Sequence, residues 1–395
     1  MKKSGITFLA CALLFALLCP FFGASTYAVE AVDAVKSTSG LKIQATSAVL
    51  MEYETGTILY EQNADAPLPP ASITKIMTLL LIMEGIDNGK IKLDDMVTAS
   101  ERAAGMGGSQ IYLKVGEQMT ARDLIKSVVI ASANDAAAAL AEFYCGSIEA
   151  FVDRMNEKAK ELSLKNTHFE NTNGLDDTTV EHYTSARDVA IMSRALISHP
   201  LILTFSSIWM DSVRNGAFGL TNTNRLVRFY PGATGLKTGS TSKAKFCISA
   251  TAMRNGMHLI AVVMGSPTRD IRNEEAKKLL DYGFANYALY HDEEKTDMEM
   301  PLHGGTQNTC RVKSAPFTAL VEKGNENAVE RKICLPEYLR PPISKGEKIG
   351  TVAYYIGEKQ VGEGEIVSCE DIGKISFWEL FIRLLKNGVG LSSEK

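Results

Sequence analysis

A serine and a lysine three residues apart, Ser72 and Lys75, are the first pair in this sequence whose spacing suits chemistry. The apolar spacing from Ser72 to about Gly85 is helical, and residues three apart share a helix face, so the hydroxyl and the amine are expected to meet. Serine becomes a nucleophile when a neighbouring base takes its proton, and lysine can be that base when its pKa is lowered. A serine at a helix start also gains backbone N–H groups that stabilise an oxyanion. An N-capping serine beside a solvated lysine is the alternative explanation.

Two further motifs follow along the chain. Residues 132–134 (Ser-Ala-Asn) lie between two predicted helices, where a loop can present a hydroxyl and a carboxamide. Residues 237–239 (Lys-Thr-Gly) enter a predicted strand, and a glycine there lets a substrate backbone approach the strand edge. Taken singly, these motifs are also explained by an ordinary turn and a strand-end lysine. Chance does not readily supply all three motifs in this order, beginning at positions 72, 132 and 237.

With these motifs, the chain resembles the low-molecular-mass D-alanyl-D-alanine carboxypeptidases, a family of penicillin-binding serine peptidases. Ser-x-x-Lys, Ser-Asp-Asn and Lys-Thr-Gly form the signature of penicillin-binding proteins and class A β-lactamases, and the middle motif here reads Ser-Ala-Asn. The matching segments are residues 70–78, 132–136, 166–169, 173–175, 185–188 and 234–241. The resemblance is dense over about residues 45–290 and looser over the β-rich segment and the C-terminal tail that follow.

The resemblance implies a reaction and its catalytic residues. The family removes the terminal D-alanine from peptidoglycan pentapeptide stems through an acyl-enzyme, and β-lactam antibiotics acylate the same serine. Ser72 would be the nucleophile, Lys75 its base and Ser132 a proton relay. The expected partners are a stem peptide ending in D-Ala-D-Ala and β-lactams, and no cofactor or metal is expected.

The family also implies a set of substrate-binding residues. Asn134 would hold the substrate amide, Lys237 would bind the terminal carboxylate, and the backbone N–H groups of Ser72 and Ser240 would form the oxyanion hole. Arg272 matches an arginine that the family uses near that carboxylate, although a surface arginine at a helix start is the alternative. The full expected set is Asn134, Lys237, Thr238, Gly239, Ser240 and Arg272.

The fold implied by the resemblance is α/β (α+β). A β-lactamase/transpeptidase-like domain, with a central antiparallel sheet and a helical lobe, is followed by a small all-β domain. The residues themselves predict a hairpin at Asn255-Gly256, the strongest turn signal in the chain, and short β-type runs after about Tyr290. The expected boundaries are a signal peptide over 1–28, a catalytic domain over 42–290, a β-rich domain over 295–370 and an amphipathic helix over 373–391.

The two ends of the chain predict where the protein works. Lys2 and Lys3 precede an apolar run and then small residues up to Ala28, which is typical of a secretory signal peptide, with an uncleaved anchor as the alternative. Near the other end, bulky apolar residues surround one helical stripe of polar ones: Ser376, Glu379, Arg383 and Lys386. Such a helix is too short to cross a hydrocarbon core of ~30 Å and is expected to lie in the membrane interface, unless it packs on its own protein. We therefore expect a secreted protein, peripheral to the outer face of the bacterial cytoplasmic membrane.

Composition and absent motifs exclude several other classes. The 42 basic and 46 acidic residues give a formal charge of −4, so no nucleic-acid partner is expected. The sequence has no Gly-x-Ser-x-Gly, no His-Glu-x-x-His and no Cys-x-x-Cys, which excludes the usual serine–histidine hydrolase and zinc sites. Two alternatives stay open. A secreted β-lactamase is disfavoured because no Glu-x-x-Leu-Asn lies between Asn134 and Lys237, and a non-catalytic cell-wall-binding protein is disfavoured because all motif residues are present.

Overall fold

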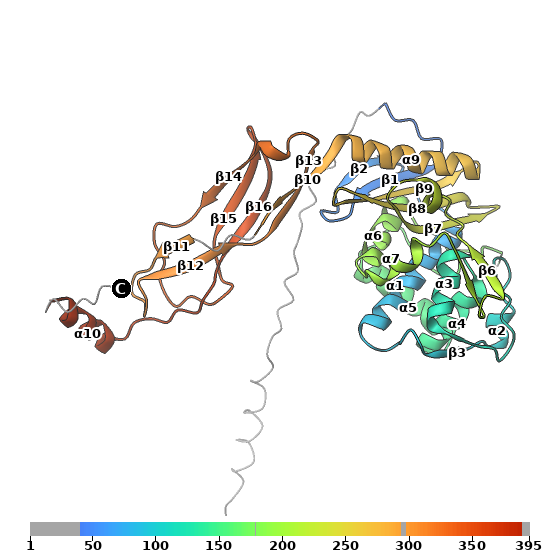
Figure 1. Ribbon diagram of the computed structural model, residues 1–395, viewed down its shortest axis with the longest axis horizontal. Coiled ribbons are helices and arrows are strands. Elements are labelled where there is room, and N and C mark those ends of the chain that lie inside the picture. The colour runs from blue at the N-terminus through green and yellow to red at the C-terminus, as the bar shows by residue number, and fades with distance from the viewer. Residues whose placement is uncertain (1–39, 178, 294–297, 389–395) are drawn as a thin grey trace, which may run out of the picture. The chain divides into compact units, whose positions relative to one another are not determined.

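The computed structural model describes residues 40–177, 179–293 and 298–388. The predicted signal peptide lies outside the described residues. The elements from β1 to α9 form the catalytic domain, and those from β10 to β16 form the C-terminal β domain (Figure 1).

A five-stranded antiparallel sheet forms the centre of the catalytic domain, in the order β2-β1-β9-β8-β7. Its strands are β1 (Ser47–Glu52), β2 (Ile58–Gln62), β7 (Ala233–Thr241), β8 (Lys245–Arg254) and β9 (Met257–Ser266). The sheet has a hydrophobic core on each face, and successive residues of a strand pack into opposite cores. In β9, Leu259 packs in one core and Ile260 in the other. Because both faces are buried, these strands appear in the sequence as continuous apolar runs. The predicted Asn255-Gly256 hairpin joins β8 to β9, with both turn residues at positive φ.

Helices cover both faces of this sheet. Helix α9 packs on one face, and the larger core on the other face includes α1, α3, α4 and α6 (Figure 1). The helices are α1 (Lys75–Asp87), α2 (Glu101–Ala104), α3 (Ala121–Ile130), α4 (Asn134–Cys145), α5 (Ile148–Glu161), α6 (Ala186–Ile197), α7 (Leu201–Ser206), α8 (Leu226–Phe229) and α9 (Arg269–Asn286). Helix α1 is preceded by a 3-10 turn, η1 (Ala71–Thr74), and is apolar almost all round because it lies inside the domain.

Two small hairpins complete the catalytic domain. Strands β3 (Met96–Thr98) and β4 (Gln118–Thr120) pair with each other, as do β5 (Met210–Val213) and β6 (Phe218–Thr221). Local capping explains where helix α3 begins: the side chain of Thr120 accepts a hydrogen bond from the backbone N–H of Asp123, as its sequence predicts.

The C-terminal β domain contains two antiparallel sheets. One has the order β11-β12-β16-β15-β14 and the other pairs β10 with β13. The strands are β10 (Tyr287–Asp292), β11 (Met298–Pro301), β12 (Thr309–Ser314), β13 (Phe317–Glu322), β14 (Val329–Cys334), β15 (Lys348–Ile356) and β16 (Lys359–Ser368), with a 3-10 turn η2 (Glu326–Ala328). Tyr354 links the two sheets, since its ring stacks on Phe317 and its hydroxyl donates to the Asp292 carboxylate. The core continues to Ile372, two residues beyond the boundary expected from the sequence.

The described cysteines are all free thiols: Cys145, Cys247, Cys310, Cys334 and Cys369. Cys247 is buried in the core of the catalytic domain, and Cys145 is half-buried against the same cluster. The described part of the chain ends with helix α10 (Phe377–Gly388). None of the described helices is both long and apolar enough to span a membrane.

Candidate active site

The first predicted pair, Ser72 and Lys75, meets as the helical spacing requires. Ser72 lies in η1 and Lys75 begins α1, and the Nζ of Lys75 is 2.9 Å from the Oγ of Ser72. Ser72 is half-buried whereas Lys75 is fully buried. The Ser72 hydroxyl is therefore reachable from solvent, while the Lys75 amine is not.

Three oxygen atoms surround the amine of Lys75. Besides the Ser72 hydroxyl, Nζ lies 2.6 Å from Oδ1 of Asn134 and 2.9 Å from the backbone carbonyl of Asn173. A neutral amine in this position keeps two N–H groups for Asn134 and Asn173 and turns its lone pair toward Ser72. The geometry thus suits an amine that accepts the serine proton.

The charge state of Lys75 follows from its surroundings. Burial lowers the pKa of Lys75 well below its ordinary value, because the charged form loses its hydration. The positive charge of Lys237 lowers this pKa further, and the Asp135 carboxylate acts in the opposite direction. Asp135 is itself buried and accepts hydrogen bonds from the backbone N–H groups of Ile111 and Leu113. The burial of Lys75 and the positive charge of Lys237 together favour the neutral form of the Lys75 amine.

The second and third motifs meet at Lys237. Its Nζ donates to the Ser132 hydroxyl at 2.8 Å and to the Thr238 carbonyl at 2.9 Å. Burial and the nearby charge of Arg272 lower the pKa of Lys237 to about 7. Because Ser132 accepts this bond, its own hydroxyl hydrogen is available to another acceptor. Ser132 has φ of 60°, a backbone conformation that is uncommon for serine and orients this side chain at the turn before α4.

Asn134 is held in place from two sides. Its Nδ2 donates to the carbonyl of Gly107 at 2.7 Å, and its backbone N–H donates to the carbonyl of Ser109 at 2.7 Å. Because the amide nitrogen is occupied by a carbonyl, the Oδ1 atom is the one that faces Lys75. The loop before α4 therefore holds Asn134 in the orientation in which its Oδ1 atom faces the Lys75 amine.

Strand β7 runs directly beside Ser72. A Cβ atom on Gly239 would lie 2.9 Å from the backbone nitrogen of Ser72 and 3.0 Å from the carbonyl of Pro70, so only glycine permits this approach. The next residue, Ser240, is exposed, and the Thr238 hydroxyl donates to that of Thr223 at 2.7 Å. The arrangement brings the β7 backbone to the Ser72 amide, as an oxyanion hole built from both segments needs.

Arg272 lies in the first turn of α9 and is buried, which is not the surface position considered as its alternative. Its Nε and one Nη donate to Oδ1 of Asn273, and its other Nη donates to the Cys247 carbonyl at 3.4 Å. Burial lowers the pKa of Arg272 to about 10, so the group stays charged at neutral pH. In this structure its charge acts on Lys237, whose pKa it lowers.

The loop that contributes the Asn173 carbonyl has no role assigned to it from the sequence. Its shape depends on Asn171, whose Oδ1 accepts hydrogen bonds from the backbone N–H groups of Asn173 and Gly174. It is tied to the end of β7, because Asp176 accepts a bond from Thr241 and its carbonyl accepts one from Lys243. An Asn-x-Asn-Gly turn is the only local signal for this loop.

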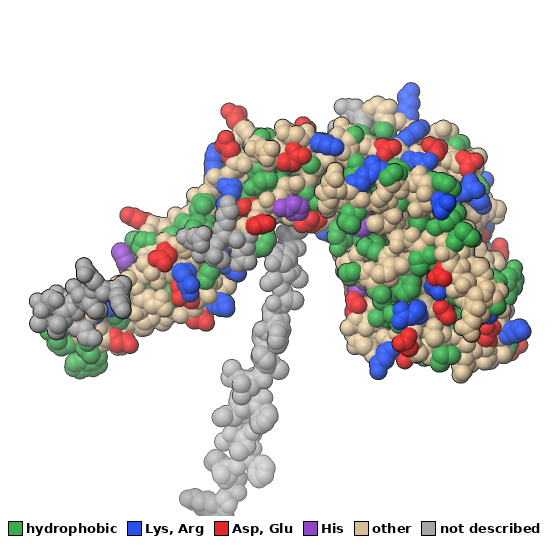
Figure 2. Space-filling model, viewed as in Figure 1, with side chains coloured by type: hydrophobic (Ala, Val, Ile, Leu, Met, Phe, Trp, Pro, Cys, Tyr) green, Lys and Arg blue, Asp and Glu red, His purple; other side chains and the backbone are tan. Residues whose placement is uncertain are grey.

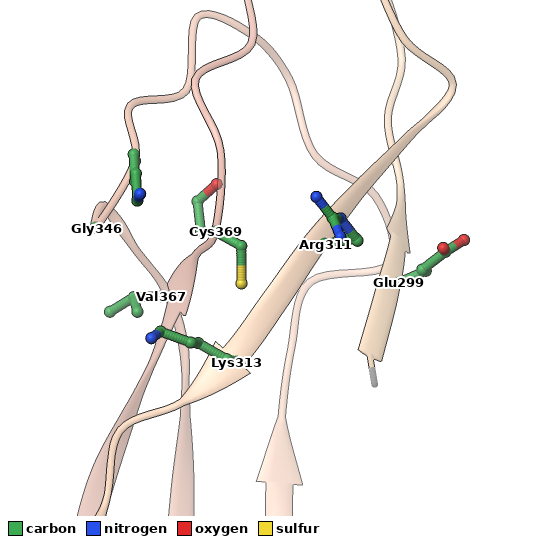
Figure 3. Close-up of a pocket in the computed structure, with 8 residues that line it drawn as sticks. Glu299, Arg311, Lys313, Gly346, Val367 and Cys369 are labelled. Carbon is green, nitrogen blue, oxygen red and sulfur yellow. The ribbon is translucent and has the colours of Figure 1, made fainter. Parts of the chain in front are cut away.

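A large cavity in the C-terminal β domain is separate from these motifs. It measures about 870 Å³, and charged side chains that line it include Glu299, Arg311 and Lys313 (Figure 3). None of the predicted site residues lines it. The candidate active site is accordingly the cluster around Ser72 in the catalytic domain.

Comparisons with known proteins agree with the geometry. Residues 34–268 match the family model described as D-alanyl-D-alanine carboxypeptidase, and residues 284–374 match the penicillin-binding protein 5 C-terminal domain. The chain is 43% identical to the D-alanyl-D-alanine carboxypeptidase DacF of Bacillus subtilis, over 90% of this chain and 92% of that protein.

Solved structures give the same result. Penicillin-binding protein 5 from Haemophilus influenzae is similar with a TM-score of 0.77 and 34% identity, covering 85% of this chain and 99% of that one. Penicillin-binding protein D2 from Listeria monocytogenes, solved in its ampicillin-bound form, has a TM-score of 0.57 and 33% identity, covering 62% of this chain and 98% of that one. The fold expected from the sequence is confirmed, and the chain belongs to the D-alanyl-D-alanine carboxypeptidase family.

Proposed function

We propose that this chain is a serine-type D-alanyl-D-alanine carboxypeptidase that removes the terminal D-alanine from peptidoglycan pentapeptide stems. The observation that carries the proposal is the buried Lys75 amine, 2.9 Å from the Ser72 hydroxyl and influenced by the charge of Lys237. Release of D-alanine from diacetyl-L-Lys-D-Ala-D-Ala by the purified protein tests this function directly. A folded protein that releases none would be a non-catalytic wall-binding protein instead.

The proposed acylation step uses the contacts around Lys75. Its neutral amine takes the proton of the Ser72 hydroxyl, and Oγ attacks the carbonyl carbon of the penultimate D-alanine. The resulting oxyanion is stabilised by the backbone N–H groups of Ser72 and Ser240. Lys75, now an ammonium, keeps its bonds to Asn134 and to the Asn173 carbonyl. Lys75 keeps the proton until the acyl-enzyme is hydrolysed.

The proposed second half of the reaction releases D-alanine and restores the serine. The Ser132 hydroxyl passes a proton to the leaving amine as the C–N bond breaks, and the Lys237 ammonium, whose Nζ donates to Ser132, resupplies that proton. Water then attacks the acyl carbonyl and gives its proton through Ser132 to Lys237, while the Lys75 ammonium returns its proton to the Ser72 oxygen as the ester bond breaks. A β-lactam would acylate Ser72 in the same way, and its ring-opened product stays attached to the serine.

Recognition of the terminal carboxylate is assigned to Lys237 with Arg272 in support. We expect Arg272→Ala to lower kcat/KM for diacetyl-L-Lys-D-Ala-D-Ala by about 10- to 100-fold, since a hydrogen bond to a charged group contributes roughly 1.5–3 kcal/mol. Arg272→Lys should recover part of this loss, because it keeps the charge without the planar fork. Steady-state kinetics with a thermal melt for each variant make the measurement. Unchanged kcat/KM in Arg272→Ala would confine the residue to packing against Asn273 and Cys247.

Helix α10 is the proposed contact with the membrane surface. The side chains of Phe377, Trp378 and Leu384 are 73%, 69% and 61% exposed, and Figure 2 shows apolar side chains gathered over this helix. On the polar stripe, Arg383 instead donates to the Thr306 carbonyl and to Oδ1 of Asn308. A soluble amphipathic helix normally buries its apolar side, so this arrangement supports an interfacial helix.

Removal of α10 is expected to release the protein from membranes. The chain should end after Ile375, because Ile372 belongs to the β-domain core and the backbone N–H of Ile375 donates to Gly304. We expect the truncated protein to stay in the supernatant with vesicles of phosphatidylglycerol and phosphatidylethanolamine, while penicillin acylates it at the full-length rate.

The Ser376 side chain accepts a hydrogen bond from the backbone N–H of Glu379 at the start of α10. Comparing Trp378→Ser with Ser376→Ala should separate apolar contact with the membrane from this helix cap, with only Trp378→Ser weakening sedimentation. Equal sedimentation of truncated and full-length protein would contradict the proposal.

A secreted, peripheral location on the outer face of the cytoplasmic membrane completes the proposal. It combines the predicted signal peptide over 1–28 with the exposed apolar side of α10. The substrate class fits this location, because peptidoglycan stems lie outside that membrane.

A further inference from the structure

A chain of hydrogen bonds leads from His182 to the residue before the nucleophile. The backbone N–H of Glu170 donates to Nδ1 of His182 at 2.9 Å, and Nε2 of His182 lies 2.8 Å from the Thr74 hydroxyl. Thr74 in turn donates to the carbonyl of Ala71 at 2.9 Å. His182, Thr74 and Ala71 are all buried. The chain therefore connects the loop around residue 170 with the turn that carries Ser72.

The direction of these bonds is determined by their donors. Nδ1 of His182 accepts the Glu170 N–H, so the ring hydrogen is on Nε2 and is donated to Thr74. Thr74 has one hydroxyl hydrogen, and it goes to Ala71. Burial lowers the pKa of His182 to about 4, with the Glu170 carboxylate acting in the opposite direction, so the neutral ring that this pattern requires is present at neutral pH.

The carbonyl at the end of this chain belongs to a residue in an unfavourable conformation. Ala71 has φ of 48°, a left-handed conformation that costs a non-glycine residue about 1 kcal/mol. A Cβ atom on Gly174 would lie 1.7 Å from the Ala71 carbonyl oxygen, so the loop backbone also packs directly on this peptide group. Contacts of this kind hold an unfavourable conformation where the site needs it.

We infer that His182 is a positioning residue which, through Thr74, holds the Ala71 carbonyl and so directs the Ser72 hydroxyl toward Lys75. The inference rests on the proposed function and extends it to a buried histidine that takes no part in the proton transfers. The same loop supplies the Asn173 carbonyl to Lys75, so the loop positions the base directly and the nucleophile through His182. A displacement of about 1 Å at a nucleophile can lower a rate 10²-fold.

The test removes the Thr74 hydroxyl without changing its shape. We expect Thr74→Val to lower the rate constant for acylation by benzylpenicillin 10- to 100-fold, and to lower kcat for diacetyl-L-Lys-D-Ala-D-Ala with little change in KM. Thr251→Val is the matched control, since Thr251 lies in β8 and its buried hydroxyl accepts a hydrogen bond from the Thr234 hydroxyl at 2.8 Å. Among the described residues, no side-chain hydrogen bond joins Thr251 to the loop that supplies the Asn173 carbonyl to Lys75. Both variants should lose similar thermal stability, and only Thr74→Val should lose acylation rate. Thr74→Ser should restore acylation to within about threefold of the wild type.

A second buried histidine in the same domain, His258, provides another comparison. His258 is buried like His182, and its Nε2 lies 2.8 Å from the Thr234 hydroxyl. We expect His182→Gln to slow acylation and His258→Gln to leave it unchanged. Adding His182→Gln to Thr74→Val should cause little further loss, because the histidine acts through the threonine.

Two outcomes would overturn the inference. One is a Thr74→Val protein whose acylation rate equals that of Thr251→Val, and the other is a Thr74→Ser protein that is no faster than Thr74→Val. A wild-type protein that benzylpenicillin does not acylate would instead contradict the proposed function. The two failures are therefore distinguished by the wild-type measurement alone.

Discussion

Replacing Ser72 by alanine is expected to abolish covalent attachment of benzylpenicillin and to reduce D-alanine release by at least about 10³-fold, given losses of roughly 10⁶-fold for nucleophile removal in a serine protease. The physical reason is that no other hydroxyl on the described residues is placed within hydrogen-bond distance of Lys75. Intact-protein mass spectrometry followed by peptide mapping makes the measurement. A single adduct on Ser72 is expected in the wild type, with slow loss because the sequence carries no Glu-x-x-Leu-Asn stretch.

The alanine variant should fold normally. Among the described residues, the Ser72 side chain is hydrogen-bonded to Lys75 alone, and the Lys75 amine keeps its other two partners in the variant. The cost should be at most ~1 kcal/mol of unfolding free energy, the size of a typical helix-start substitution. A thermal melt is the control. An adduct at a different residue, or a folded alanine variant with full activity, would contradict the assignment of the nucleophile.

The acylation rate is expected to rise with pH and to reach its plateau at a pH below the pKa of an ordinary lysine. Lys75 must be neutral to take the Ser72 proton, and burial with the charge of Lys237 lowers its pKa well below the usual ~10.4. The neutral fraction therefore increases as pH rises through the lowered pKa, and the rate increases with it. Stopped-flow acylation by a chromogenic or fluorescent β-lactam, from mildly acid to alkaline pH, measures the profile.

Two variants test the origin of this profile. Lys75→Arg should lose acylation by at least about 10³-fold, because a guanidinium does not deprotonate in this pH range. Lys237→Gln removes the neighbouring charge and should move the rising limb to higher pH, although overall rates fall through weaker carboxylate binding. A rate independent of pH, or a limb that moves to lower pH in Lys237→Gln, would show that Lys75 is not the base.

Local features of the catalytic domain are predictable because they depend on short spacings. The contact between Ser72 and Lys75 follows from residues three apart at a helix start, and the Asn255-Gly256 hairpin from two turn residues between apolar runs. Helix boundaries are less accurate: α9 begins at Arg269, five residues before the start at Glu274 that the apolar pattern indicates. Its cap is Thr268, whose side chain accepts from the Ile271 backbone N–H, a signal that the apolar pattern alone does not contain.

Helix α6 is absent from the elements expected from the sequence, although its start carries a recognisable signal. The Ser185 side chain accepts a hydrogen bond from the backbone N–H of Asp188, which is a helix cap. From the sequence, residues 185–188 are identified as a segment that matches the family, and no helix is predicted to begin there. Many of the helix's residues are buried between α1 and the sheet, so tertiary packing stabilises it more than its own composition does.

By itself, the sequence determined the family, the identity of the motif residues and the local pairs that one helix or one turn creates. The tertiary structure decided which distant groups meet: Asn134 reaches Lys75 across 59 residues, Lys237 reaches Ser132 across 105, and His182 reaches Thr74 across 108. It also decided that a main-chain carbonyl, at Asn173, is the third oxygen around the Lys75 amine. The physical reason is that periodicity along a chain encodes which face a side chain occupies, whereas contacts between distant segments depend on how loops close. A backbone carbonyl is the same in every residue, so only the folded chain shows which one the lysine binds.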